Sequence, residues 1–307
     1  MWEKTVMNDA GSQNQIAKLL KLATMASVAT ATILIVAKLI AWTLTGSVSI
    51  LAALVDSLMD AAASLFNFFA VRFSLQPPDK EHRFGHGKAE SLSGLAQATF
   101  IAGSALFLLL EAVNRLFHPQ PLEDLVVGIS VMGFSIVATL ILLTIQRYVI
   151  RRTGSLAIRA DALHYATDLL TGISVIAALL LTYFLSWRKA DSVFAIGIAM
   201  YILYSAWRIG YEAIQALIDR ELPDEDRQKI KAIAMGHEGV FGVHDLRTRQ
   251  SGQIKFIQLH LELDKSLSLE QTHQVADEVE AMICKEFPHS DVIIHQDPVT
   301  VDSLFRR

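Results

Sequence analysis

The stretch "LVDSLMDAAASL", residues 54–65, carries two aspartates in a segment that is otherwise apolar enough to lie inside a membrane. A carboxylate at membrane depth is costly, and ionisable residues in such positions usually have a function. Asp56 and Asp60 are four residues apart, so a helix presents both side chains on one face. The stretch therefore predicts a membrane-spanning helix whose paired carboxylates require a partner that compensates their charge.

The composition of the whole chain supports this reading. Its 307 residues are 52% hydrophobic with a mean hydropathy of +0.38, which is too apolar for an ordinary soluble protein of this length. A helix that crosses a bilayer needs about 20 mainly apolar residues. The first apolar segment is too long, and too closely followed by the second, to be a cleaved signal peptide. The sequence predicts six transmembrane helices, within residues 22–45, 48–74, 89–114, 123–145, 155–186 and 191–213.

Three parts of the chain follow from this pattern: an N-terminal cytoplasmic segment (1–21), a six-helix transmembrane domain (22–213) and a C-terminal domain (214–307). Lys and Arg favour cytoplasmic loops, and they are concentrated before the first segment, around residues 72–88 and around residues 147–159. Both termini, and the C-terminal domain, are therefore expected on the cytoplasmic side.

The C-terminal domain predicts a small α+β fold. Pro223 and the acidic residues after it begin a helix that Gly236 can end, and Ser268 with Gln271 can form a capping box for a second helix. Alternating segments at 242–250, 254–264 and 290–297 predict three strands, the first two joined by a hairpin. The expected order is α-β-β-α-β.

The charge and the cysteine count exclude nucleic-acid binding, an intrachain disulfide and one type of zinc site. The formal net charge is −4 and no basic tract suits nucleic acid. Cys284 is the single cysteine, which excludes an intrachain disulfide and a Cys-rich zinc site.

A second polar pair in the fifth apolar segment matches the first. In "SLAIRADALHYATDLL", His164 and Asp168 are also four residues apart. Packed against Asp56 and Asp60, they would give three carboxylates and one imidazole, the four ligands of a tetrahedral zinc site. Mixed oxygen and nitrogen donors suit Zn²⁺, Cd²⁺ or Fe²⁺. The ligands bind metal only when deprotonated, so metal and protons compete, with His164 as the natural proton acceptor.

The alternative for these residues is a set of polar side chains packed at a helix interface. Asp161 could be an outer ligand, a proton relay or a charge at the membrane boundary. Lys38 could reach towards the membrane surface or pair with a carboxylate. The sequence does not assign it a function.

Two further clusters combine histidine with carboxylate. Asp79, His82 and His86 lie in the loop after the second segment, where the alternative is an ordinary polar loop. In the C-terminal domain, strand alternation places candidate ligands on shared faces, with Asp297 able to bridge two metals. The candidates in strands are His244, His260, His295 and Asp297, and His273, on a predicted helix, could meet them at the same surface.

Together these motifs resemble the cation diffusion facilitator family. The similarity extends over nearly the whole chain after the first ~20 residues, a variable terminus. It is carried by "LAALVDSLMD", "HRFGHGKAESL", "ADALHYATD", "HDLRTRQSG" and "DVIIHQDP".

The resemblance implies a homodimer in the bacterial inner membrane. Each protomer would export Zn²⁺ from the cytoplasm in exchange for H⁺ by alternating access, and the C-terminal domain would have a metallochaperone-like, ferredoxin-like fold. Asp56, Asp60, His164 and Asp168 would form the transport site. The other two clusters would be a loop site and a cytoplasmic binuclear site. The resemblance also implies a charge interlock between Lys88 and Asp219 at the dimer junction, and a hydrophobic gate that includes Leu163.

Other functions remain to be weighed. A membrane hydrolase would need an open coordination position, which four protein ligands do not leave. A metal sensor would not need ligands at membrane depth. A manganese transporter is disfavoured by the imidazole among the ligands.

Overall fold

The computed structural model describes residues 2–46, 48–117, 125–185 and 190–299. The chain divides into two compact units. The helical unit comprises Ile16–Ile214, and the second unit comprises Gln215–Arg307 together with Met1–Gln15.

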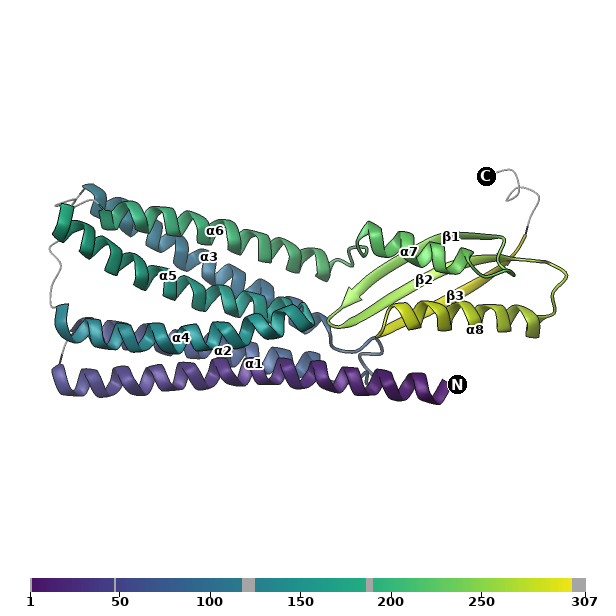
Figure 1. Cartoon of the computed structure of the whole chain (residues 1–307), viewed down its shortest axis with the longest axis horizontal. Helices are drawn as coiled ribbons and strands as arrows, with labels where there is room; N and C mark the ends of the chain where they lie inside the picture. Colours follow the sequence, from purple (N-terminus) through teal and green to yellow (C-terminus); the bar gives the residue numbers. More distant parts are fainter. Residues whose placement is uncertain (1, 47, 118–124, 186–189, 300–307) are drawn as a thin grey trace. The chain divides into compact units, whose positions relative to one another are not determined.

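Six long helices correspond to the six apolar segments (Figure 1). The predicted segment 1–21 does not form a separate element, because α1 is one continuous helix from Trp2 onward. Helices α3, α4 and α6 extend past a predicted end, since helical hydrogen bonding continues beyond the apolar residues into polar ones, whereas α2 has the predicted bounds and α5 lies within them. Their bounds are α1 Trp2–Thr45, α2 Val48–Ser74, α3 Lys88–Phe117, α4 Leu125–Thr153, α5 Leu156–Leu185 and α6 Ala190–Leu217.

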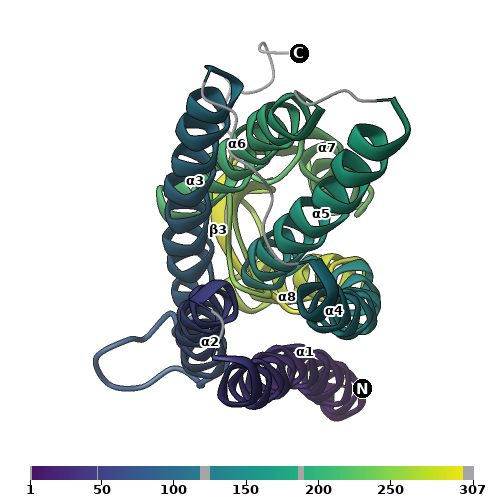
Figure 2. The ribbon, with the colours of Figure 1, turned by 90° about the vertical axis from the view of Figure 1, so that its left-hand side faces the viewer.

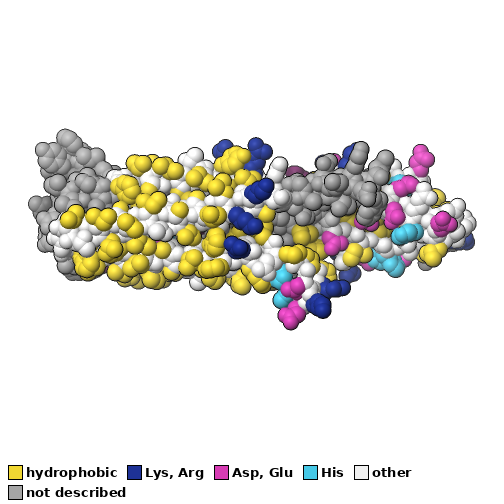
Figure 3. All heavy atoms as spheres, turned by 90° about the horizontal axis from the view of Figure 1, so that it is seen from below, with side chains coloured by type: hydrophobic (Ala, Val, Ile, Leu, Met, Phe, Trp, Pro, Cys, Tyr) yellow, Lys and Arg dark blue, Asp and Glu magenta, His cyan; other side chains and the backbone are white. Residues whose placement is uncertain are grey.

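Within the described residues, five of these helices are long and apolar enough to cross a membrane: α1, α2, α3, α4 and α6. The described side chains of α5 include the charged residues Arg159, Asp161 and Asp168, so the sixth crossing stays a prediction. Large apolar side chains such as Phe107 and Trp207 are 73% exposed. Figure 3 shows hydrophobic side chains spread over one face of the helical unit. A surface of this kind is compatible with lipid and not with water.

Helix α5 packs against α2, α3 and α4, as the end-on view in Figure 2 illustrates. Gly94 of α3 permits close approach, because a Cβ there would lie 3.1 Å from Leu156 Cγ. Two groups satisfy the first backbone N–H groups of α5: the Glu90 carboxylate accepts from Leu156 N at 3.0 Å, and Ser155 Oγ from Ile158 N at 3.3 Å. The start of the helix that carries His164 is therefore fixed to α3.

The second unit has the predicted order α-β-β-α-β. Its elements are α7 Asp224–Met235, β1 Gly242–Ser251, β2 Ile254–Leu263, α8 Leu269–Glu286 and β3 Ser290–Pro298. The sheet order is β1-β2-β3, with β1 antiparallel and β3 parallel to β2. One apolar core joins both helices to the sheet and includes Ile230, Leu259 and Ile283. The alternate residues of β2, among them Gln258 and His260, lie on the opposite face.

The predicted helix boundaries in this unit are confirmed. Pro223 precedes α7, and Gly236 is its C-cap. Ser268 and Gln271 form the predicted capping box of α8, with Ser268 N donating to Gln271 Oε1 at 2.9 Å and Gln271 N to Ser268 Oγ at 3.3 Å.

Removing this cap tests how much it stabilises α8. Ser268→Ala should cost about 1 kcal/mol, which corresponds to about fivefold faster amide exchange in the first turn of α8. Ser268→Thr keeps the hydroxyl and should exchange like the wild type. Equal exchange in the alanine variant and the wild type would show that the cap contributes nothing.

Candidate functional site

Helices α2 and α5 bring three predicted ligands together in the helical unit. His164 Nε2 lies 2.9 Å from Asp60 Oδ1 and 4.0 Å from Asp168 Oδ2. Each of the three residues offers a ligand atom within 4.8 Å of the other two. His164 is buried, whereas the Asp168 side chain is 40% exposed, so the cluster is not fully enclosed.

Asp56, the fourth predicted ligand, is not in this cluster of ligand atoms. It lies one turn before Asp60 on α2 and is exposed. Nearby, Lys38 Nζ of α1 donates to Ser57 Oγ at 2.6 Å and to Ala53 O at 3.2 Å. Lys38 thus ties α1 to the part of α2 that carries Asp56.

The loop between α2 and α3 brings its three predicted ligands together. Asp79 Oδ1 lies 3.3 Å from His82 Nδ1, and Asp79 Oδ2 lies 3.2 Å from His86 Nε2. The backbone N–H of His82, together with that of Glu81, donates to Asp79 Oδ1 and holds the pKa of this carboxyl below its usual range. His86 Nδ1 is buried without a hydrogen-bond partner among the described residues. The donor set is suited to a divalent cation.

The exposed face of the sheet carries a third cluster. Asp297 Oδ2 lies 2.8 Å from His260 Nδ1 and 3.3 Å from His244 Nε2, while Asp297 Oδ1 lies 3.3 Å from His295 Nε2. The two oxygens of one carboxylate therefore face different histidines, as a bridging ligand requires.

His273 was predicted in this cluster, and the structure does not place it there. It lies on α8, its side chain is 72% exposed, and its nearest carboxylate is Asp277 at 3.7 Å. Helix α8 packs on the apolar face of the sheet, whereas His260 lies on the other face. Sequence alternation could not reveal this, because it gives the face of a strand residue but not the orientation of a helix.

Comparison with known proteins supports these assignments of fold. Residues 24–218 match the family model described as the cation efflux transmembrane domain, and residues 222–299 match the cation efflux protein cytoplasmic domain. The chain belongs to the cation efflux family. This confirms the resemblance inferred from the motifs, and it identifies the helical unit as part of a membrane-spanning metal efflux protein, a transporter rather than an enzyme.

Individual relatives agree with the family match. The chain is 55% identical over 284 residues to the cation-efflux pump FieF of Salmonella agona (strain SL483) and to that of Klebsiella pneumoniae. Each comparison covers 92% of this chain and 94% of the relative. A solved structure of CzrB in a zinc form is 32% identical, with a TM-score of 0.25, covering 26% of this chain and 92% of its own.

This cation efflux protein also contains a buried polar network that the sequence did not reveal. Asp161 is 1% exposed, and its Oδ2 accepts from Ser27 Oγ at 2.5 Å and from Gln146 Nε2 at 2.7 Å. These three residues join α5 to α1 and α4. Next to His164, the Tyr165 hydroxyl lies 2.8 Å from Ser64 Oγ of α2 and donates to Ser27 O at 3.3 Å.

The residues assigned to the gate and to the charge interlock belong to different segments of the chain. Leu163 is partly buried against residues of α3 and α6, among them Ala98 and Ile202. Lys88 is the first residue of α3. Asp219 has a φ of 59° and lies 3.4 Å from Arg249 Nη1.

The Asp161 network should stabilise the helical unit. Asp161→Ala removes the carboxylate that accepts from both Ser27 and Gln146, and leaves the Ser27 hydroxyl its contact with Ala23 O and the Gln146 amide its contact with Ser27 Oγ. We therefore expect a loss of about 1–2 kcal/mol and a lower unfolding temperature in detergent. Asp161→Asn retains an acceptor oxygen and should lose less. An unchanged unfolding temperature for the alanine variant would contradict this role.

Proposed function

We propose that this chain is a secondary active transporter that exports Zn²⁺ from the cytoplasm in exchange for H⁺, with Cd²⁺ and Fe²⁺ as further substrates. The observation that carries the proposal is the convergence of Asp60, His164 and Asp168 from α2 and α5 inside an apolar helical unit. Ionisable residues at membrane depth commonly mark ion pathways.

The donor set fits a borderline divalent cation. Two carboxylates and one imidazole supply three ligands, and Asp56, one turn along α2, supplies a fourth when the site closes around the ion. Four ligands of this kind make a tetrahedral site for Zn²⁺. A divalent charge would also offset carboxylates that are costly to keep ionised among apolar side chains.

The contact between His164 and Asp60 explains why protons and metal exclude one another. His164 Nε2 and Asp60 Oδ1 lie 2.9 Å apart, so a proton carried by either atom would be shared in a hydrogen bond between them. A metal ion bound to both atoms needs their lone pairs, so it must displace that proton. Metal binding on one side of the membrane would therefore release a proton, and reprotonation on the other side would release the metal.

Alternating access then requires α2 and α5 to change position while keeping the ligands together. Leu163, packed towards α3 and α6, is suited to close one path to the site. The protein would function as a homodimer in the bacterial inner membrane, with both termini cytoplasmic and with Lys88 and Asp219 interlocking the protomers. The loop cluster and the cytoplasmic cluster would hold metal that stabilises the dimer or reports the metal level.

The transport site can be tested by removing one ligand. Asp60→Ala should abolish Zn²⁺ uptake by proteoliposomes, because a tetrahedral site that loses one carboxylate ligand binds Zn²⁺ much more weakly. The variant should still elute as a folded protein in size-exclusion chromatography. Asp264→Ala, which removes an exposed carboxylate of the second unit, is the matched control and should transport normally. Uptake by Asp60→Ala at the wild-type rate would rule out the assignment.

A further inference from the structure

Strand β1 contains an irregularity next to the cytoplasmic cluster. His244 pairs with His260, and the next regular pair is Arg247 with Gln258. Asp245 and Leu246 in β1 therefore lie opposite Leu259 alone in β2. One extra residue on one strand is a β-bulge, a feature that re-aims side chains and is frequent near functional sites.

The bulge changes which way Asp245 and Leu246 face. In a regular strand, successive side chains alternate, so Asp245 would point into the apolar core and Leu246 away from it. In the structure Leu246 is in the core at 8% exposure, while His244 and Asp245 are both exposed. Asp245 has a φ of 48°, in the left-handed region that non-glycine residues seldom adopt.

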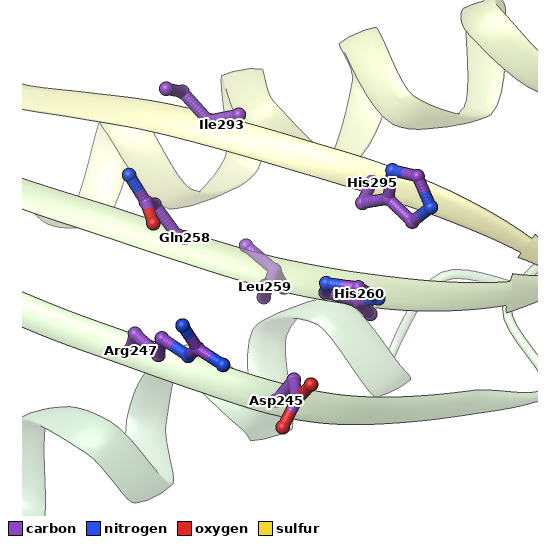
Figure 4. Close-up of a pocket in the computed structure, with 7 residues that line it drawn as sticks. All are labelled: Asp245, Arg247, Gln258, Leu259, His260, Ile293 and His295. Atoms are coloured by element: carbon purple, nitrogen blue, oxygen red, sulfur yellow. The ribbon is translucent and has the colours of Figure 1, made fainter.

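The bulge places the Asp245 carboxylate next to two histidines that could bind a metal ion. His244, Asp245 and His260 each offer a ligand atom within 4.8 Å of the other two. His260, His295 and Asp297 form a second such group, so the two groups share His260. Figure 4 shows Asp245, His260 and His295 on three neighbouring strands. They line a pocket of about 340 Å³.

We propose that Asp245 is a metal ligand of the cytoplasmic cluster, providing the carboxylate for a divalent cation on the His244 side as Asp297 does on the His295 side. The inference rests on the metal-binding role given above to this cluster. It adds a residue that strand alternation excludes and only the bulge makes available.

Charge supports a further carboxylate at this position. Without Asp245 the cluster has two carboxylates: Asp297, and Glu262, whose Oε1 lies 3.8 Å from His244 Nε2. Two divalent cations carry four positive charges, and Arg247 lines the same pocket, so these two carboxylates offset the charge only in part. With Asp245 each cation has a carboxylate beside it, and oxygen with imidazole nitrogen is a donor set that Zn²⁺ accepts.

The rival explanation is that Asp245 serves only the backbone. Aspartate and asparagine both tolerate left-handed φ better than most residues, and glycine tolerates it best. Asp245→Asn and Asp245→Gly therefore preserve the bulge while removing the carboxylate. If Asp245 mattered only for backbone conformation, both variants would bind metal like the wild type.

The test is a Zn²⁺ competition titration of the full-length protein in detergent against a chromophoric chelator. The transport site is inactivated by Asp60→Ala and the loop site by His86→Ala, so that the cytoplasmic cluster is observed alone. In this background, Asp245→Asn and Asp245→Gly should each weaken one Zn²⁺ equivalent by about tenfold or more. Asp291→Asn, an exposed carboxylate at the opposite end of β3, is the matched control and should bind as the background protein does.

The outcomes separate this inference from the proposed function. Unfolding temperatures without metal should match the background for both Asp245 variants, which excludes misfolding as the cause of lost binding. Unchanged Zn²⁺ affinity in either variant would overturn the proposal, and so would a background protein that binds no Zn²⁺. Neither result depends on proton-coupled flux, which is measured separately on protein with an intact transport site.

Discussion

The function proposed for the helical unit depends on the contact between His164 of α5 and Asp60 of α2. An ionised aspartate at the centre of a membrane helix costs about 3 kcal/mol on insertion scales, and this chain places several in or next to apolar helices. The 2.9 Å contact lowers that cost while the site holds a proton, and a metal ion would lower it when the proton leaves. A bound proton and a bound metal ion each compensate the negative charge of the aspartates inside the membrane.

Other features of the fold hold these two side chains in register. Glu90 and Ser155 fix the start of α5, and the Asp161 network attaches α5 to α1 and α4. Tyr165, the residue after His164, reaches Ser64 of α2 and the backbone of α1. Near His164, polar contacts therefore join α5 to α1, α2 and α4, whereas Leu163 faces apolar residues of α3 and α6. The polar contacts of α5 with α3 and α6, made by Glu90 and by the Arg159–Glu212 ion pair, lie at the start of α5.

Much of this was readable from the sequence, and the failures have physical causes. Helix period predicted that Asp56 and Asp60 share one helix face and that His164 and Asp168 share another. Asp60, His164 and Asp168 do converge, whereas Asp56 lies outside the cluster. Local signals predicted the capping box at Ser268. Within this chain His273 of α8 does not reach the sheet cluster, because the orientation of a helix depends on tertiary packing that the sequence pattern does not give. Asp245 was missed because a bulge breaks the alternation on which strand prediction relies. The Asp161 partners Ser27 and Gln146 are 134 and 15 residues away, and no local pattern joins them.

The central claim is that one site exchanges metal for protons. The most direct measurement follows Zn²⁺ entry and internal pH together in proteoliposomes, with and without an imposed proton gradient. Coupled exchange predicts that Zn²⁺ uptake is accompanied by proton release from the vesicles, and that an acidic interior accelerates uptake. A Zn²⁺ flux that is independent of the proton gradient and is accompanied by no proton movement would contradict the exchange of metal for protons.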